Sequence, residues 1–156
     1  MPKETNSNAG GESSSDAASD EYDVIIVGAG AAGVGVAIAL VHAGVENFLI
    51  VDRDTVGSSF AAWPEETKFI TPSFPSNSIG MLDLNSIAIG ISPAFTMRVE
   101  HPTGKQFAAH LQDIANYFEL PVEEDTDIKS IEKIDDIFHL GTDEGVLLSK
   151  NVIWAA

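Results

Sequence analysis

A chain of 156 residues with an apolar fraction of 44% is long enough to fold as one domain around a buried core. Its 24 acidic and 8 basic residues leave a net charge of −16, which excludes nucleic acid and anionic membranes as partners because both carry the same sign. The chain has no cysteine, which excludes disulfides, thiolate metal sites and a CxxC redox pair within it, and its four scattered histidines do not indicate a metal site.

The excess of carboxylates favours a protein of a salt-rich cytoplasm, that is, a halophilic one. Acidic side chains keep such a protein hydrated, and the surrounding salt screens their mutual repulsion. The alternative is an acidic, soluble, cytoplasmic protein with no such adaptation.

The first twenty residues, MPKETNSNAGGESSSDAASD, contain no large apolar residue after Met1. They cannot bury enough surface to offset the chain entropy that folding would cost. They also lack the basic start and apolar centre of a signal peptide. We therefore predict a disordered acidic tail over residues 1–20 and a single folded domain over residues 21–156.

Residues 24–45 carry no charge, apart from His42 when it is protonated, and form a run long enough to be a candidate membrane span. Glycines crowd the centre of this run, β-branched residues open it, and no basic cluster flanks it. All three features argue against a membrane helix. We interpret the run instead as a buried strand over residues 22–27, a glycine turn, and a helix over residues 31–43.

Gly28, Gly30 and Gly33 have the spacing G-x-G-x-x-G, between the predicted strand and the predicted helix. In a dinucleotide site with this spacing, the first glycine permits the tight turn and the second lets the backbone approach a pyrophosphate. The third lets the helix pack closely on the strand. The free N–H groups and the positive dipole end of the helix then face the phosphates. This motif predicts a dinucleotide-binding site, with a Rossmann-like turn that binds no ligand as the alternative.

A second apolar strand, Phe48–Val51, ends at Asp52, nineteen residues after Gly33. A carboxylate at this position is expected to accept hydrogen bonds from the ribose of the adenosine. Because a carboxylate repels a 2′-phosphate, the site should prefer FAD or NAD over NADP. Arg53 beside it weakens that preference slightly.

The chain then continues through RDTVGSSFAAWPEETKFITPSFPSNSIG instead of returning at once to a helix. With DVIIVGAGAAG and Asp52, this segment resembles the FAD domain of flavin monooxygenases and thioredoxin-reductase-like enzymes, in the superfamily of FAD-dependent pyridine-nucleotide oxidoreductases. The part WPEETKFITPSFPSNSIG is also similar to the bacillithiol-disulfide-reductase-like branch, which reduces without a CxxC pair. The resemblance covers residues 22–156. It implies an α/β fold, namely a Rossmann-like FAD/NAD(P)-binding domain whose parallel sheet carries an inserted three-stranded antiparallel β-meander.

The later segments are consistent with that fold. Apolar residues at helical spacing predict an amphipathic helix over residues 104–120, which Pro121 ends before a short strand. Turn residues at 135–136 and 143–145 separate three short strands, which the resemblance identifies as the meander: residues 127–134, 137–142 and 145–151. A fourth parallel strand is expected over residues 151–156.

The resemblance places residues 57–63 and Thr71 of TKFITPSF near the flavin, and Ile128 against the adenine. Trp63 has a packed core aromatic as its alternative interpretation. No catalytic residue and no metal ligand is predicted. The predicted cofactor-binding residues are Gly28, Ala29, Gly30, Ala31, Ala32, Gly33, Asp52, Arg53, Gly57, Ser58, Ser59, Phe60, Trp63, Thr71, Ile128 and Ala155.

In the resembled family the last strand leads into a turn with a glycine, and a second G-x-G-x-x-G motif for NADPH follows. Ala155 and Ala156 are present here but that glycine and that motif are not. We therefore expect the N-terminal FAD-binding portion of a longer NAD(P)H-dependent flavin oxidoreductase, monooxygenase-like in type. A disulfide reductase without CxxC and a non-catalytic nucleotide-binding remnant are the alternatives. A homodimer stays open for the full-length enzyme.

Overall fold

The computed structural model describes residues 21–72 and 85–156. The predicted tail over residues 1–20 lies outside these residues, as does the part of the TKFITPSF segment that follows Pro72.

A six-stranded sheet organises the described chain, with the strand order β3-β2-β1-β6-β5-β4. Strands β3, β2, β1 and β6 are parallel to one another. Strands β5 and β4 continue the sheet beyond β6 in antiparallel pairing. The predicted α/β class, with a parallel sheet and an antiparallel meander, is confirmed. The strands are β1 Glu21–Val27, β2 Phe48–Val51, β3 Val122–Glu123, β4 Ser130–Ile134, β5 Ile137–Gly141 and β6 Val146–Trp154.

The last strand differs from the prediction. Residues 145–151 and 151–156 were expected to be two strands, but β6 is one strand that serves both the meander and the parallel sheet. Its start pairs with β5, and its end pairs with β1 as far as Trp154 beside Val27. Asn151, at which the two predicted strands met, lies inside the ladder between β1 and β6. Its side-chain amide donates a hydrogen bond to the Asp23 carbonyl at 2.9 Å.

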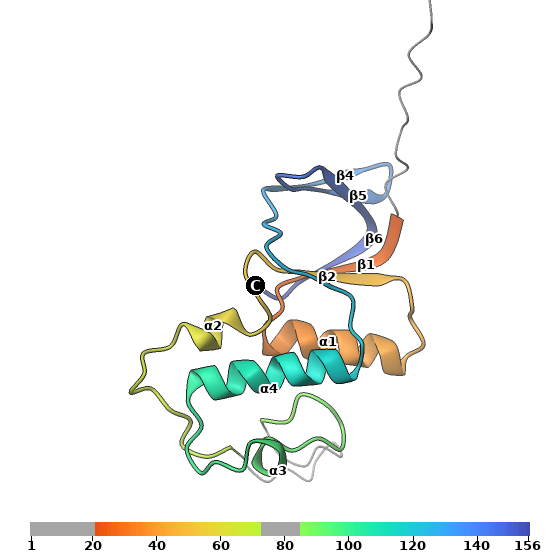
Figure 1. The fold of residues 1–156 in the computed structure, drawn as a ribbon. Coiled ribbons are helices and arrows are strands. Elements are labelled where there is room, and N and C mark those ends of the chain that lie inside the picture. Colours follow the sequence, from red (N-terminus) through yellow and green to blue (C-terminus); the bar gives the residue numbers. More distant parts are fainter. Residues whose placement is uncertain (1–20, 73–84) are drawn as a thin grey trace, which may run out of the picture.

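Two long helices, α1 and α4, cover one face of the sheet, and the curled β4–β5 hairpin lies over the other face (Figure 1). Helix α4 is amphipathic as predicted and begins with a capping box, in which Thr103 and Gln106 exchange side-chain and backbone hydrogen bonds. The helices are α1 Ala31–His42, α2 Ser58–Ala61, α3 Pro93–Met97 and α4 Gly104–Tyr117.

Apolar side chains are buried on both faces of the parallel strands. Ile26 and Ile50 pack toward the helices, whereas Ile25, Val27 and Val51 pack toward the meander. This explains why the strands are continuous apolar runs. The run once considered as a membrane span is thus divided between β1 and the twelve-residue α1. None of the helices in residues 21–72 and 85–156 is long and apolar enough to cross a membrane.

Candidate functional site

The loop between β1 and α1 makes the tight turn that its glycine spacing predicts. Gly28 has a φ of +109°, and a Cβ on it would lie 2.8 Å from backbone atoms of Ala155. A Cβ on Gly33 would overlap the carbonyl oxygen of Gly28. The first and third glycines are therefore required by the chain itself, because any side chain there would meet backbone.

Gly30 differs from these two glycines, because a Cβ on it would have no described atom within 4 Å. It is the N-cap of α1, and no side chain of the described residues caps this helix end. The first intrahelical bond runs from the Val34 N–H to the Gly30 carbonyl at 3.0 Å. The N–H groups of residues 31–33 therefore have no acceptor within the helix, and Gly30 immediately before them faces open space. This arrangement suits an anion.

Asp52 connects this loop to the end of β2. One of its carboxylate oxygens accepts a hydrogen bond from the Ala29 N–H at 2.6 Å, and the other accepts from the Asp54 N–H at 2.9 Å. A backbone hydrogen bond also joins the glycine loop to the end of β2, because the Gly28 N–H donates to the Val51 carbonyl at 2.8 Å. The carboxylate is therefore held in a fixed position, and its remaining lone pairs are available to a ligand.

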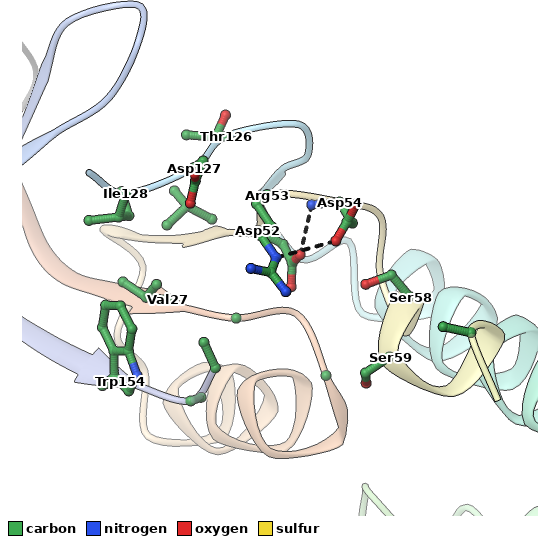
Figure 2. A pocket seen from close by; sticks show the side chains of 16 residues that line it. Val27, Asp52, Arg53, Asp54, Ser58, Ser59, Thr126, Asp127, Ile128 and Trp154 are labelled. Carbon is green, nitrogen blue, oxygen red and sulfur yellow. Dashed lines mark hydrogen bonds and ion pairs between the residues drawn. The ribbon is translucent and has the colours of Figure 1, made fainter. Parts of the chain in front are cut away.

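A pocket of about 540 Å³ opens at the carboxyl ends of β1, β2 and β6, where these elements meet (Figure 2). Its volume lies in the range of about 300–1,000 Å³ that is typical of cofactor sites. Its location follows the rule that ligands of open α/β sheets bind outside the carboxyl ends of the strands. The lining residues are Val27, Gly28, Gly30, Val51, Asp52, Arg53, Asp54, Ser58, Ser59, Ala62, Thr126, Asp127, Ile128, Trp154, Ala155 and Ala156.

The structure brings half of the predicted cofactor residues together in this pocket. Of the others, Ala29, Ala31, Ala32 and Gly33 lie in the glycine loop and the first turn of α1. That any of these residues contacts a cofactor stays a prediction. The predicted residues that line the pocket are Gly28, Gly30, Asp52, Arg53, Ser58, Ser59, Ile128 and Ala155.

The predicted flavin contacts Phe60 and Trp63 do not line the pocket. Their ring centroids lie 5.2 Å apart, and both rings pack against Phe69. Phe60 and Phe69 in turn pack against Phe107, which completes an aromatic cluster. This supports the alternative interpretation of Trp63 as a packing residue. Thr71 also lies outside the wall, with its carbonyl accepting a hydrogen bond from the Asn85 side chain at 3.1 Å.

Gly57, also predicted as a cofactor residue, permits close packing of the start of α2 on α4. It begins α2 with a φ of +75°, and a Cβ on it would lie 2.9 Å from Cα of Ala108 in α4. Its N–H donates to the Ala29 carbonyl at 3.0 Å. Gly57 thus sets the position of Ser58 and Ser59 beside the glycine loop without lining the pocket itself.

Sequence reasoning missed half of the pocket wall. The sequence did contain a signal for them, namely their position at the carboxyl ends of the parallel strands. Every missed residue except Ala62 either ends one of these strands or follows it within a few residues. The missed lining residues are Val27, Val51, Asp54, Ala62, Thr126, Asp127, Trp154 and Ala156.

The pocket is acidic at one rim. Asp52, Asp54 and Asp127 line it, and the nearby Arg53 is exposed, with its guanidinium 3.5 Å from the Asp54 carboxylate. A hydrogen bond from Lys129 at 2.8 Å holds the pKa of the Asp127 carboxyl below its usual value, so this group stays charged at neutral pH. These carboxylates oppose a phosphate at this rim, in contrast to the N–H groups of α1.

Residues 25–156 match the pyridine nucleotide-disulphide oxidoreductase family. An uncharacterized oxidoreductase named CzcO from Bacillus velezensis is 28% identical over 136 residues, which cover 86% of this chain and 36% of that protein. This chain therefore spans about a third of the length of that relative.

Two solved structures share the fold. The bacillithiol disulfide reductase of Staphylococcus aureus matches with a TM-score of 0.71 and 20% identity, over 87% of this chain and 38% of that one. A flavin-containing monooxygenase from Stenotrophomonas maltophilia matches with a TM-score of 0.69 and 18% identity, again over 87% and 38%. With the family match covering nearly all of the described residues, the chain belongs to the pyridine nucleotide-disulphide oxidoreductase family.

Proposed function

We propose that this chain is the FAD-binding portion of a flavin-dependent NAD(P)H oxidoreductase, monooxygenase-like in type. The observation that carries the proposal is the shared pocket of the glycine loop, the uncapped start of α1 and the fixed Asp52 carboxylate. N–H donors suit a pyrophosphate and a carboxylate suits a ribose. Gly30 at the start of α1 and Asp52 both line one cavity of about 540 Å³.

The described residues fit an FAD molecule in defined roles. The N–H groups of residues 31–33 and the open space at Gly30 would hold the pyrophosphate, and Asp52 would hold the adenosine ribose. Ser58 and Ser59 would line the side toward the flavin. Bound flavin supplies the redox chemistry by accepting hydride and passing electrons on, and the protein positions it.

A disulfide reductase of the type without CxxC is the second candidate, because a bacillithiol disulfide reductase shares the fold of this chain. The two candidates differ in their electron acceptor. An enzyme containing this chain that consumes NADPH with a low-molecular-weight disulfide, without taking up oxygen, would favour the reductase. Oxygen uptake coupled to an organic substrate would favour the monooxygenase.

The proposal predicts that the chain binds FAD through its adenosine diphosphate half. Titration of the protein into FAD, in concentrated potassium chloride, should change the flavin fluorescence in a saturable manner. Riboflavin should give no such change, because it lacks the phosphates and ribose that the loop and Asp52 hold. Equal binding of riboflavin and FAD would contradict the assigned roles, and a folded protein that binds neither would contradict the proposal.

The charge of the chain predicts an unusual dependence of this binding on salt. FAD is an anion and the protein carries a net charge of −16, so repulsion should weaken binding in dilute buffer. Raising potassium chloride from about 0.1 M to about 2 M shortens the screening length from about 10 Å to below 3 Å, and should lower the Kd for FAD several-fold.

Adenosine, which is uncharged, is the matched control ligand and should bind with an affinity that salt changes little. Circular dichroism at each salt concentration separates this effect from unfolding of the protein. If FAD affinity falls with salt while the protein stays folded, the electrostatic argument is wrong.

A further inference from the structure

Trp154, at the end of β6, is a large aromatic side chain in the wall of the pocket that is left 60% exposed. Its register partner in the sheet is Val27, which is 6% exposed. Among the described residues that line the pocket, Trp154 is the one with an aromatic ring. A flat apolar surface left in water at a ligand site gains free energy when a ligand covers it.

The pocket has two chemically different ends, which Figure 2 shows on opposite sides of Asp52 and Arg53. Ser58 and Ser59 form the polar end at the start of α2. Val27, Ile128 and Trp154 form the other end, where Val27 and Ile128 belong to the apolar cluster between the sheet and the meander. This second end therefore has an apolar wall beside Asp52, with Thr126 and Asp127 next to Ile128 at its edge (Figure 2).

The position of the anchors decides which part of a dinucleotide meets that wall. A ribose held by Asp52 carries its phosphate toward the glycine loop and its base on the opposite side. We infer that the indole of Trp154 is the surface on which the adenine base of the cofactor stacks, an inference that rests on the proposed function. Stacking of bases on aromatic side chains contributes about tenfold to hundredfold in affinity, irrespective of the identity of the base.

Stacking also suits the charge of this site. The carboxylates of Asp52, Asp54 and Asp127 repel an anionic ligand over a distance, whereas the attraction between an indole and a base does not depend on charge. Trp154 thus supplies affinity at the rim where the electrostatic field opposes the phosphates.

The test uses the fluorescence of Trp154 itself in the full chain. The chain has two tryptophans, and Trp63→Phe leaves Trp154 as the reporter while keeping an aromatic ring in the cluster with Phe60. ADP should quench the emission of Trp154 in a saturable manner, and ribose 5-phosphate, which lacks the base, should not.

Substitutions in the otherwise unaltered chain provide the second readout. Trp154→Leu should raise the Kd for FAD about tenfold, and Trp154→Phe should restore most of the affinity because it keeps an aromatic face. Tyr117→Leu is the matched control, since Tyr117 is 76% exposed on α4 and does not line the pocket. It should leave FAD binding unchanged.

The outcomes separate this inference from the proposed function. If FAD binds but ADP does not quench Trp154, and Trp154→Leu binds FAD as tightly as the unaltered chain, the stacking role is wrong while the proposed function stands. If ADP quenches Trp154 and FAD does not bind, stacking is supported and the proposed cofactor is wrong. If neither ligand binds the folded protein, both are wrong.

Discussion

Replacing Gly33 by alanine should abolish FAD binding and lower the free energy of unfolding by about 3 kcal/mol or more, at the upper end of the usual cost of overpacking. The added methyl group would overlap the carbonyl oxygen of Gly28 and would lie 3.4 Å from the Ile26 side chain. Backbone atoms cannot rotate away as a side chain can, so α1 would have to move off β1. That movement would displace the N–H groups that we propose for the pyrophosphate.

Gly30→Ala is the matched control, because it adds the same methyl group to the same loop. A Cβ at Gly30 meets no described atom within 4 Å, so the free energy of unfolding should change by less than about 1 kcal/mol. FAD binding should nevertheless weaken strongly, since the methyl group would occupy space next to the phosphates. Urea unfolding and flavin titration of the two variants therefore separate packing from ligand contact. Equal stability of Gly33→Ala and the unaltered chain would refute the packing argument.

The contrast between these glycines also shows what the sequence alone could predict. The tight turn at Gly28, the close packing at Gly33 and the position of Asp52 depend on a strand, a turn, a helix and a second strand that are consecutive in the chain. Spacing and periodicity were therefore sufficient to predict them. The strand Phe48–Val51 was predicted with its observed bounds for the same reason, as a short apolar run between turn residues.

The remaining features depend on contacts between distant parts of the chain. Trp154 lies beside Val27 because β6 is parallel to β1, and no local pattern in NVIWAA indicates this. Phe60 in α2 and Trp63 after it were assigned to the flavin by resemblance. The structure packs Phe60 edge-to-face against Phe107 of α4, at a centroid distance of 4.8 Å. Gly104 is similar, since a Cβ there would overlap the Phe60 carbonyl oxygen. Such packing depends on tertiary structure that spacing does not encode.

Replacing Asp52 by alanine should raise the Kd for FAD about a hundredfold. The variant would lose the charge-assisted hydrogen bonds that we propose between this carboxylate and the ribose, each of which would contribute about 1.5–3 kcal/mol. It would also leave the N–H groups of Ala29 and Asp54 without their acceptor, which should loosen the glycine loop. Asp52→Asn keeps the shape of the side chain, but its single amide oxygen can serve only one of these two N–H groups. Its effect should therefore be intermediate.

A competing effect has to be separated from this one, because removing a carboxylate from an acidic pocket also reduces the repulsion of an anionic ligand. Asp54→Asn isolates that effect. It removes the same unit of charge from the same pocket, but its exposed side chain makes a 3.5 Å ion pair with the exposed Arg53 and accepts no hydrogen bond from the glycine loop among the described residues. We expect Asp54→Asn to change the Kd for FAD less than threefold, and in the direction of tighter binding. If Asp52→Ala and Asp54→Asn change the Kd equally, the Asp52 carboxylate acts through its charge alone. The hydrogen-bonded geometry at the end of β2 would then have no part in holding the ribose.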